Sequence, residues 1–319
     1  MAQEKNNSKV ELLTEIAYLY YEMQYTQIKI GQVMKLSNAT VSRLLKEARE
    51  SNLIEINIKY PAIRDSLLEE SLKEKFHLKN VRVLSTLNLS YASLIKRIGQ
   101  LAARLMELYL ENDMALAVSW GKSVQSTVGA LHASRPLNIR VVQAQGAFTH
   151  EMIEGSETVR RLSDLYGSNS LVIHSPLILK DKEICKILLT EPSIKEVISI
   201  AENADMALVG IGSIHPEASN FLQNNLLAEA ELEKLAQEGV VGDICGKHFN
   251  RQGEVLDNDL NQRIVSINIE KLREIPLVIG VGAGEWKKEA VLAALRGRYM
   301  NMLVTDSEIA RFLIHENEK

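Results

Sequence analysis

Residues 26–52 read TQIKIGQVMKLSNATVSRLLKEARESN, and this stretch decides the fold of the amino-terminal part of the chain. Thr26 is placed to cap a helix that starts at Gln27, and Ser37 is placed to cap a second helix after a tight turn at residues 35–37. The second helix carries an apolar stripe at helical spacing, formed by Val41, Leu44, Leu45 and Ala48. Two short helices joined by a tight turn predict a helix-turn-helix.

The flanking segments complete a small domain. Residues 11–22, ELLTEIAYLYYE, place apolar side chains at helical spacing and predict a preceding helix. In the helix that follows Thr26, Ile28 and Val33 are expected to be buried. Residues 53–60, LIEINIKY, alternate isoleucines with polar residues, which predicts a β-strand that serves as a wing or docking strand.

The charges and side chains of this region indicate DNA binding. Residues 27–49 contain five Lys or Arg and a single acidic residue, Glu47, and such a local basic bias favours contact with phosphates. At the start of the second helix, Arg43 suits guanine and Asn38 suits adenine in the major groove. A plain three-helix bundle is the alternative, but the basic bias and the polar run favour DNA. We expect DNA contacts from Thr26 and Gln27 at a phosphate, and from Asn38, Ala39, Thr40, Ser42 and Arg43 at bases.

The bulk composition indicates two globular domains. The 319 residues are 46% hydrophobic and 24% charged, with a net charge of −4, which fits one small domain and one α/β domain of roughly 250 residues. Two cysteines without CxxC spacing argue against a disulfide framework or a structural zinc. The chain has no apolar run of bilayer length and its start lacks a secretory signal, so we expect a cytoplasmic protein with no membrane partner.

The pattern changes after residue 60. Residues 61–78 predict an amphipathic linker helix whose apolar face packs either on another subunit or on its own domain; this face holds Leu67, Leu68, Leu72 and Phe76. Short apolar runs then alternate with helical segments, which predicts an α/β domain with a mostly parallel, layered sheet. The predicted strands are VRVLS, ALAVSW, IRVVQAQG, SLVIHS, MALVGIGS, RIVSIN, LVIGVGAG and MLVTD. The predicted domains are residues 1–60, the linker helix 61–78 and residues 79–319.

Glycines and polar residues follow several of these strands. Ligands of parallel sheets bind beyond the carboxyl ends of the strands, and glycine N–H groups beside lysine and serine suit an anion, so a phosphosugar pocket is predicted. Lys287 is expected to bind the phosphate and Asp243 the sugar hydroxyls; the alternatives are a surface charge and a turn cap. For the glycines the alternative is tight strand-to-helix packing. The candidate effector-binding residues are Gly121, Lys122, Ser123, Gln145, Gly146, Gly212, Asp243, Gly284, Glu285 and Lys287.

Two nucleotide-binding motifs fail on spacing. A Walker A loop needs a glycine five residues before Gly121, where Leu116 stands, and a Rossmann fingerprint that starts at Gly280 needs a small residue where Glu285 stands. Four histidines in or beside predicted loops lack the spacing of metal ligands; they are His150, His174, His215 and His248. We therefore expect no cofactor and no metal.

Across its whole length, the chain resembles the SorC family of sugar-responsive bacterial transcription regulators. The resemblance starts in residues 19–58 and continues through SWGKS at 119–123, ADMALVGIGS at 204–213, GVVGDIC at 239–245, GVGAGEWKKEAVLAALRGRYMN at 280–301 and LVTDSEIA at 303–310. It implies an effector domain similar to the glucosamine-phosphate deaminase and ribose-phosphate isomerase folds, assembled as dimers of dimers on DNA. Some family members carry a lysine near this strand end that could form a Schiff base, whereas this chain has Gln145, so noncovalent binding is implied here. Gly146-Ala147 also replaces a Gly-Gly pair that is frequent in the family.

The function that the sequence favours is an effector-responsive transcription regulator rather than an enzyme. Its expected partners are double-stranded operator DNA of a carbohydrate or polyol operon and a phosphorylated sugar or polyol. A palindromic operator implies a homodimer or homotetramer. The first alternative is a sugar-phosphate isomerase or deaminase with an accessory DNA-binding module, which needs an acid–base pair that does not stand out in the sequence. The second is a structural or protein-partner module, which would leave the pocket features without a role.

Overall fold

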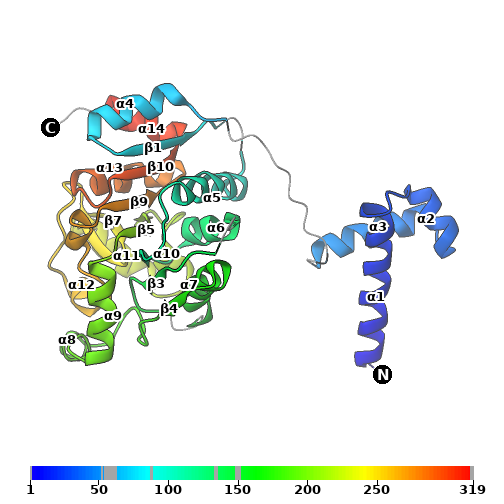
Figure 1. Cartoon of the computed structure of the whole chain (residues 1–319), viewed down its shortest axis with the longest axis horizontal. Coiled ribbons are helices and arrows are strands. Elements are labelled where there is room, and N and C mark those ends of the chain that lie inside the picture. The colour runs from blue at the N-terminus through cyan, green and yellow to red at the C-terminus, as the bar shows by residue number, and fades with distance from the viewer. Residues whose placement is uncertain are drawn as a thin grey trace. The chain divides into compact units, whose positions relative to one another are not determined.

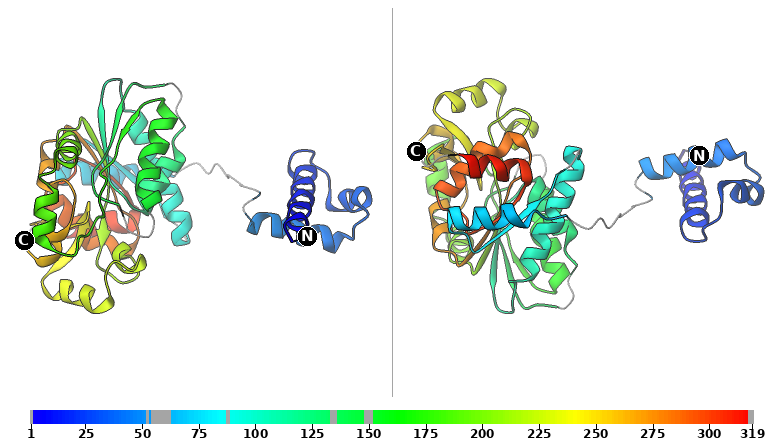
Figure 2. Two further views of the ribbon diagram at one scale, coloured as in Figure 1. Left: turned by 90° about the horizontal axis from the view of Figure 1, so that it is seen from below. Right: turned by 90° about the horizontal axis from the view of Figure 1, so that it is seen from above.

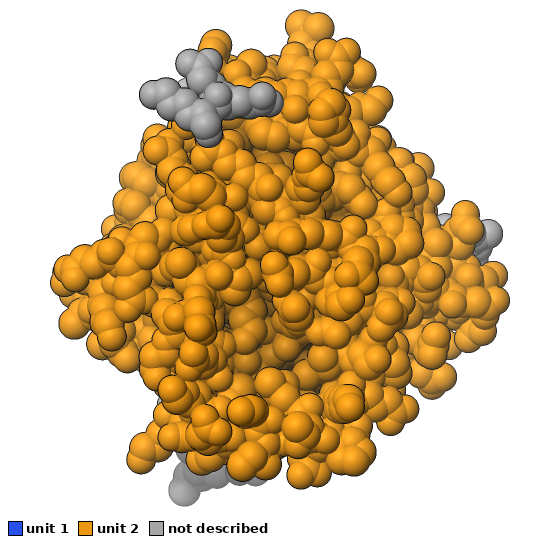
Figure 3. All heavy atoms as spheres, turned by 90° about the vertical axis from the view of Figure 1, so that its left-hand side faces the viewer, with its two compact units in different colours: residues 1–61 blue, residues 62–319 orange. Residues whose placement is uncertain are grey.

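The chain forms two compact units. The computed structural model describes residues 2–51, 53, 63–86, 89–132, 136–147 and 152–316. Contacts within the chain separate unit 1, residues 1–61, from unit 2, residues 62–319. Figure 1 shows the elements of both units, and Figure 3 shows one face of unit 2.

The described residues of unit 1 form three helices, which are α1 (Ala2–Tyr21), α2 (Gln27–Met34) and α3 (Asn38–Glu50). The Thr26 hydroxyl accepts a hydrogen bond from the N–H of Lys29 at 3.2 Å. The Ser37 hydroxyl accepts one from the N–H of Thr40 at 3.1 Å, so both predicted caps are present. Lys35 adopts the left-handed conformation with φ of 54° and ends α2. Helices α2 and α3 and the turn between them make up the predicted helix-turn-helix, and α1 is the predicted preceding helix.

The packing of unit 1 confirms the predicted stripe of α3 and corrects the buried face of α2. All four stripe residues of α3 are buried, whereas Ile28 and Val33 are 65% and 56% exposed. Helix α2 buries Ile30 and Gly31 instead. An added Cβ at Gly31 would lie 2.7 Å from the Leu36 carbonyl oxygen, so the turn passes over this face. Helix α1 begins well before the predicted residue 11, and residues 54–60 of the predicted wing strand lie outside the described residues.

Unit 2 is built on a parallel sheet of seven strands in the order β1-β10-β9-β5-β2-β3-β4 (Figure 1). From β2 the chain continues to β3 and β4 on one side, and from β5 it continues to β9 and β10 on the other. The direction therefore reverses between β2 and β5, which is the topological switch point where open α/β sheets bind ligands. The strands are β1 (Asn80–Leu84), β2 (Ala115–Val118), β3 (Arg140–Gln143), β4 (Asn169–Leu171), β5 (Met206–Gly210), β9 (Leu277–Val281) and β10 (Met302–Asp306).

Helices cover both faces of this sheet (Figure 2). One face is covered by α5, α6 and α7, and the other by α4, α9, α13 and α14. In β2, Leu116 and Val118 pack on the first face while Ala115 and Ala117 pack on the second. Burial on both faces explains why the strands read as continuous apolar runs. The helices of unit 2 are α4 (Ser66–Phe76), α5 (Tyr91–Glu107), α6 (Lys122–Ala130), α7 (Met152–Tyr166), α8 (Lys182–Leu188), α9 (Pro192–Glu202), α10 (Asn220–Gln223), α11 (Glu229–Gln237), α12 (Asp259–Arg263), α13 (Lys288–Arg296) and α14 (Ser307–His315), with 3-10 turns η1 (Ile269–Arg273) and η2 (Glu285–Lys287).

A smaller antiparallel sheet follows β5 and consists of β6 (Gly212–Ser213), β7 (Val240–Ile244) and β8 (Lys247–Asn250). Gly212 pairs with Asp243 across it. Gly242 and Asp243 therefore lie inside a strand, not beyond a strand end as the sequence suggested. Two predicted strands also differ: the strand predicted at residues 170–175 is observed only as β4, which ends at Leu171, and the strand predicted at residues 263–268 makes only isolated bridges.

The predicted linker helix packs on unit 2. Helix α4 lies against β1 and α14. Its Leu72 is fully buried, and Leu68 and Phe76 pack against the same core. Leu67 is 81% exposed. Of the two alternatives for this helix, the structure shows packing on its own unit.

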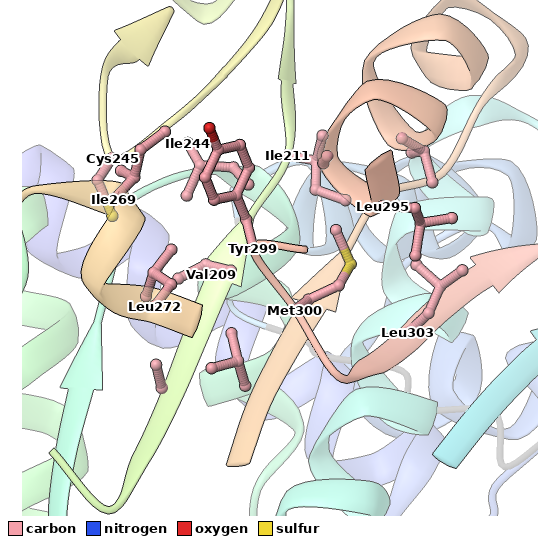
Figure 4. Packing of buried hydrophobic residues seen from close by; sticks show 14 of the residues in the cluster. Val209, Ile211, Ile244, Cys245, Ile269, Leu272, Leu295, Tyr299, Met300 and Leu303 are labelled. Carbon is pink, nitrogen blue, oxygen red and sulfur yellow. The ribbon is translucent and has the colours of Figure 1, made fainter. Parts of the chain in front are cut away.

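A buried cluster surrounds Tyr299. This residue is fully buried, and its hydroxyl donates to the carbonyl oxygen of Gly253 at 2.5 Å. Figure 4 shows Tyr299 among other side chains of the cluster, including Ile211 and Cys245. Ile211 follows β5 and Cys245 follows β7, so the cluster joins the end of β5 to the smaller sheet.

Candidate functional site

A cleft opens at the switch point between β2 and β5. It is narrow, with a cavity volume of about 20 Å³, which is room for about one water molecule, so a larger ligand requires its lining side chains to move. The Ser119 hydroxyl at the end of β2 accepts a hydrogen bond from the N–H of Gly210 at 2.9 Å, which ties the two strand ends together. The lining residues are Trp120, Gly121, Lys122, Ser123, Gln145, Gly210, Ile211, Gly212, Asn220, Phe221, Asp243, Cys245 and Lys287.

The first turn of α6 meets the cleft. Gly121 precedes this helix with φ of 142°, and no side chain caps it. Ser123 and Gln145 are each 3% exposed. Within the described residues, the Ser123 hydroxyl and the Gln145 Oε1 have no hydrogen-bond partner. Because an unpaired buried polar atom costs about 1–3 kcal/mol, these atoms are suited to a ligand, and the uncapped helix start favours an anion.

A pair of oppositely charged residues, Asp243 and Lys287, lines another part of the cleft. Lys287 Nζ donates to the Ile211 carbonyl oxygen at 2.7 Å. Burial lowers the pKa of Lys287 to about 8; the Asp243 charge opposes this shift and Lys122 adds to it. Burial raises the pKa of Asp243 to about 6, opposed by the Lys287 charge and by a hydrogen bond from the Gly246 backbone. Both groups are therefore mainly ionised at neutral pH, so the cleft offers a cation beside a hydrogen-bond acceptor.

Two of the cleft glycines cannot be replaced by a larger residue without strain, one because of a close neighbour and one because of its backbone conformation. An added Cβ at Gly212 would lie 1.8 Å from Asp243 Oδ1, so any side chain there displaces the carboxylate. At Gly121 the nearest atom to an added Cβ is Asn220 Nδ2 at 3.7 Å, and the positive φ is what requires glycine.

Helix α10 lies at the mouth of the cleft. It brings Asn220 and Phe221 into the lining, and Gln223 Oε1 accepts a hydrogen bond from Lys122 Nζ at 2.6 Å. The exposed Lys122 ammonium group is thus held at the mouth by a neutral partner, which an anionic ligand could replace.

The structure brings together most of the predicted effector-binding residues. The cleft is lined by Gly121, Lys122, Ser123, Gln145, Gly212, Asp243 and Lys287. Three others do not line it. Gly146 packs against Pro176, whose carbonyl oxygen would be 2.6 Å from an added Cβ. Gly284 donates its N–H to Asp306, and Glu285 is exposed.

Sequence reasoning missed six lining residues, namely Trp120, Gly210, Ile211, Asn220, Phe221 and Cys245. Trp120 and Ile211 adjoin a predicted site residue in the sequence, and Gly210 and Cys245 lie two residues from one, so a window of two residues around each glycine or aspartate would have included all four. Asn220 and Phe221 come from the segment 214–227, which has no periodic pattern that could have indicated its position.

The start of α3 exposes most of the side chains that were predicted to contact DNA. Asn38, Ala39, Ser42 and Arg43 are exposed on the side away from the buried stripe. The Thr40 hydroxyl shares a 2.8 Å hydrogen bond with Ser37, while Thr26 is engaged as the cap of α2 and Gln27 is half-buried.

The described residues give little support to metal or acid–base chemistry. No group of three or more His, Cys, Asp or Glu among them could hold a metal ion. In the described cleft, Asp243 is the single carboxylic acid. His248 is buried, and burial lowers its pKa to about 4, while His215 stacks on Trp286 with ring centroids 4.6 Å apart. None of the helices in the described part of the chain is long and apolar enough for a membrane span.

A helix-turn-helix unit joined to an α/β unit with a polar cleft at its switch point defines a ligand-responsive DNA-binding regulator. Residues 60–315 match the Sugar-bind family model, described as "Putative sugar-binding domain". The chain is 32% identical over 318 residues to the Sorbitol operon regulator of Klebsiella pneumoniae, covering 97% of this chain and 99% of that protein. It is 33% identical over 308 residues to the Transcriptional regulator LsrR of Enterobacter sp. (strain 638), with coverages of 95% and 93%.

Structural similarity leads to the same family. The crystal structure of the full-length Sorbitol Operon Regulator SorC from Klebsiella pneumoniae matches with a TM-score of 0.70 and 30% identity, covering 96% of this chain and 99% of that one. The chain belongs to the SorC family of transcription regulators. The α/β fold is thereby confirmed, and the named relatives are regulators rather than enzymes.

Proposed function

We propose that the protein regulates a carbohydrate or polyol operon and that noncovalent binding of a phosphorylated sugar or polyol in the unit 2 cleft controls it. The observation that carries this proposal is the uncapped start of α6 at the switch point, with Lys122 and Lys287 beside it. Relatives named for sorbitol and for deoxyribonucleosides support a sugar-derived ligand.

Each end of such a ligand has suitable partners. The phosphate binds at the first turn of α6, where the Ser123 hydroxyl and backbone N–H groups lie within the field of Lys122 and Lys287. The hydroxyl groups bind at Asp243 and Gln145, which supply oxygen acceptors. Gln145 cannot attack a carbonyl carbon, which supports noncovalent binding.

For DNA binding, we propose that the start of α3 lies in the major groove of operator DNA in the cytoplasm. A homodimer or homotetramer presents two or more copies of unit 1 to a palindromic site. The ligand changes DNA affinity only through its differential affinity for two arrangements of the subunits. The sign of the response depends on which arrangement suits the operator.

The test is a thermal unfolding screen of the full chain against sorbitol 6-phosphate, glucose 6-phosphate, ribose 5-phosphate and 2-deoxyribose 5-phosphate. A true ligand at 100 times its Kd stabilises the fold by about 2.7 kcal/mol, which for a chain of this size raises Tm by roughly 4 °C. The parent sugars and inorganic phosphate are the controls. Equal shifts with the parent sugars would contradict phosphate recognition, and no shift with any compound would contradict the proposed site.

The pH dependence of ligand affinity provides a further prediction. The phosphate dianion no longer titrates above pH 7, whereas Lys287, with a pKa of about 8, then loses its proton. A bound dianion favours the protonated lysine. Affinity should therefore be nearly constant from pH 7 to 8 and fall toward tenfold per pH unit above it. Fluorescence titration between pH 7 and 9.5 measures this; a flat profile would show that the Lys287 charge does not contribute to binding.

A further inference from the structure

Lys287 reaches the cleft from a loop that is anchored to the end of β10. The Lys287 N–H donates to the Gly284 carbonyl oxygen at 2.9 Å, and the Gly284 N–H donates to Asp306 Oδ2 at 2.7 Å. The other oxygen of Asp306 accepts from the N–H groups of Glu308 at 2.9 Å and Ile309 at 3.0 Å, which caps α14. A single carboxylate, 1% exposed, therefore holds both the Lys287 loop and the start of α14.

Gly284 forms the turn between this anchor and Lys287. It has φ of 94°, and an added Cβ would be 3.0 Å from the Tyr91 ring at the start of α5. The positive φ and the close approach of Tyr91 both require glycine at this turn.

The residue next to the anchor connects β10 to the end of β1. Ser307 Oγ accepts from the N–H of Thr86 at 3.2 Å and shares a 2.8 Å hydrogen bond with the Thr86 hydroxyl. Ser307 is fully buried. In the sheet register, Leu84 of β1 is the partner of Asp306 itself. The carboxyl end of β1 is thus fixed to the same point that holds the Lys287 loop.

The opposite edge of β1 is covered by residues 63–65, the first described residues of unit 2 after the boundary at Pro61. The Ser85 N–H donates to the Ile63 carbonyl oxygen at 2.8 Å, and the Asp65 N–H donates to the Val83 carbonyl oxygen at 3.0 Å.

A buried carboxylate strengthens this junction. Glu69 is 6% exposed, and its Oε1 accepts from the Val83 N–H at 2.9 Å. The same carboxylate forms an ion pair with Arg64 through Nε at 2.8 Å and through a second guanidinium nitrogen. The entry of the chain into unit 2 is therefore held to β1 by backbone and charged hydrogen bonds.

We propose that Asp306 and Ser307 are positioning residues that transmit occupancy of the cleft from the Lys287 loop to the chain entry at residues 63–65. The proposal rests on the proposed function, because the ligand is what acts on Lys287. The route from Gly284 to β1 consists of the hydrogen bonds Gly284–Asp306 and Ser307–Thr86, joined by the backbone between Asp306 and Ser307 and between Thr86 and β1. Its groups are buried or half-buried, and such contiguous networks can carry coupling between sites. In the sequence, residue 63 follows the segment that joins the two units, so the chain entry is the point of unit 2 from which we expect an effect on the DNA-binding unit.

Two variants interrupt the route with little change of volume. Asp306→Asn keeps one oxygen to cap α14, for which asparagine is as good a residue, but its amide nitrogen cannot accept from Gly284. Ser307→Ala removes both bonds to Thr86. Asp181→Asn is the matched control because Asp181 caps α8 in the same way, through the N–H groups of Glu183 and Ile184. Ser163→Ala is the second control, since Ser163 is buried in α7 and bonds only locally to the Arg160 carbonyl oxygen.

The first readout needs no ligand: amide hydrogen exchange of Asp65 and Ser85 in the full chain. Both test variants should exchange at least about fivefold faster at these amides than the wild type, at equal global stability, since local opening is governed by local contacts. The controls should leave these rates unchanged. If both amides exchanged at the wild-type rate in both test variants, the proposal would be overturned.

The second readout is the ratio of operator affinities with and without the panel compound that stabilises the wild-type protein most. Coupling between sites is typically 5–150-fold; in Ser307→Ala this ratio should fall below about twofold while the Kd for the compound changes by less than about twofold. A wild-type ratio in this variant would overturn the proposal. If no panel compound affects the wild-type protein, the proposed function fails, while amide exchange still decides whether Asp306 and Ser307 hold the chain entry.

Discussion

Replacing Lys287 with methionine is expected to abolish the response to a phosphorylated ligand while leaving ligand-free DNA binding intact. Methionine retains most of the aliphatic volume but lacks the charge that the cleft offers to an anion. Removing one member of a buried charged contact costs about 2–5 kcal/mol, which corresponds to a loss of ligand affinity of at least about 30-fold. Ligand affinity is measured through tryptophan fluorescence, because Trp120 lines the cleft and Trp286 adjoins Lys287.

This substitution also removes the positive charge beside Asp243, and two controls separate that effect from ligand binding. Lys287→Met combined with Asp243→Asn removes both charges, so it should recover part of any lost stability without recovering ligand affinity. Lys288→Met alters the neighbouring exposed lysine, which lies over the Phe312 ring, and should behave as wild type. Wild-type affinity and response in Lys287→Met would show that Lys287 serves only to satisfy the Ile211 carbonyl oxygen.

The features that could be predicted from the sequence are those set by neighbouring residues. Thr26 and Ser37 cap the helices that their positions indicated, because a cap depends only on the next three residues. The burial of Ile30 and Gly31 in place of Ile28 and Val33 could not be predicted from periodicity. In an eight-residue helix the period hardly distinguishes neighbouring faces, and the turn over Gly31 decides which face meets α3.

In the cleft, too, residues whose position depends on neighbouring sequence could be predicted, and residues placed by long-range packing could not. Gly121 and Ser123 were predicted because they follow a buried strand, and the carboxyl ends of parallel strands share one edge of the sheet. Asp243 was predicted to bind sugar hydroxyls and does line the cleft, yet it reaches the cleft from within an antiparallel strand. Asn220 and Phe221 lie on a short helix whose position depends on long-range packing. The order of strands in space, which puts β2 beside β5, is not written in any local pattern.

Replacing Arg43 with alanine is expected to weaken binding to the operator by about 1–3 kcal/mol, or roughly 5- to 150-fold, while affinity for unrelated duplexes changes little. Arg43 is exposed on the first half of α3, on the side away from the buried stripe. A guanidinium group in that place can form two hydrogen bonds with guanine. Their loss should weaken binding only to duplexes that carry this guanine, which the operator does and unrelated duplexes do not. The operator is first obtained by selecting random duplexes with the wild-type protein, and affinities are then measured at two or more salt concentrations.

Arg43→Lys separates base reading from phosphate contact. Lysine keeps the positive charge but lacks the planar pair of donors, so it should restore little of the preference if Arg43 reads guanine. If Arg43 instead contacts a phosphate, the alanine variant should lose affinity equally on all duplexes, its salt dependence should fall by about one ion, and lysine should restore both. That outcome would assign sequence reading on α3 to Asn38, Ala39 and Ser42, whose side chains are exposed beside Arg43.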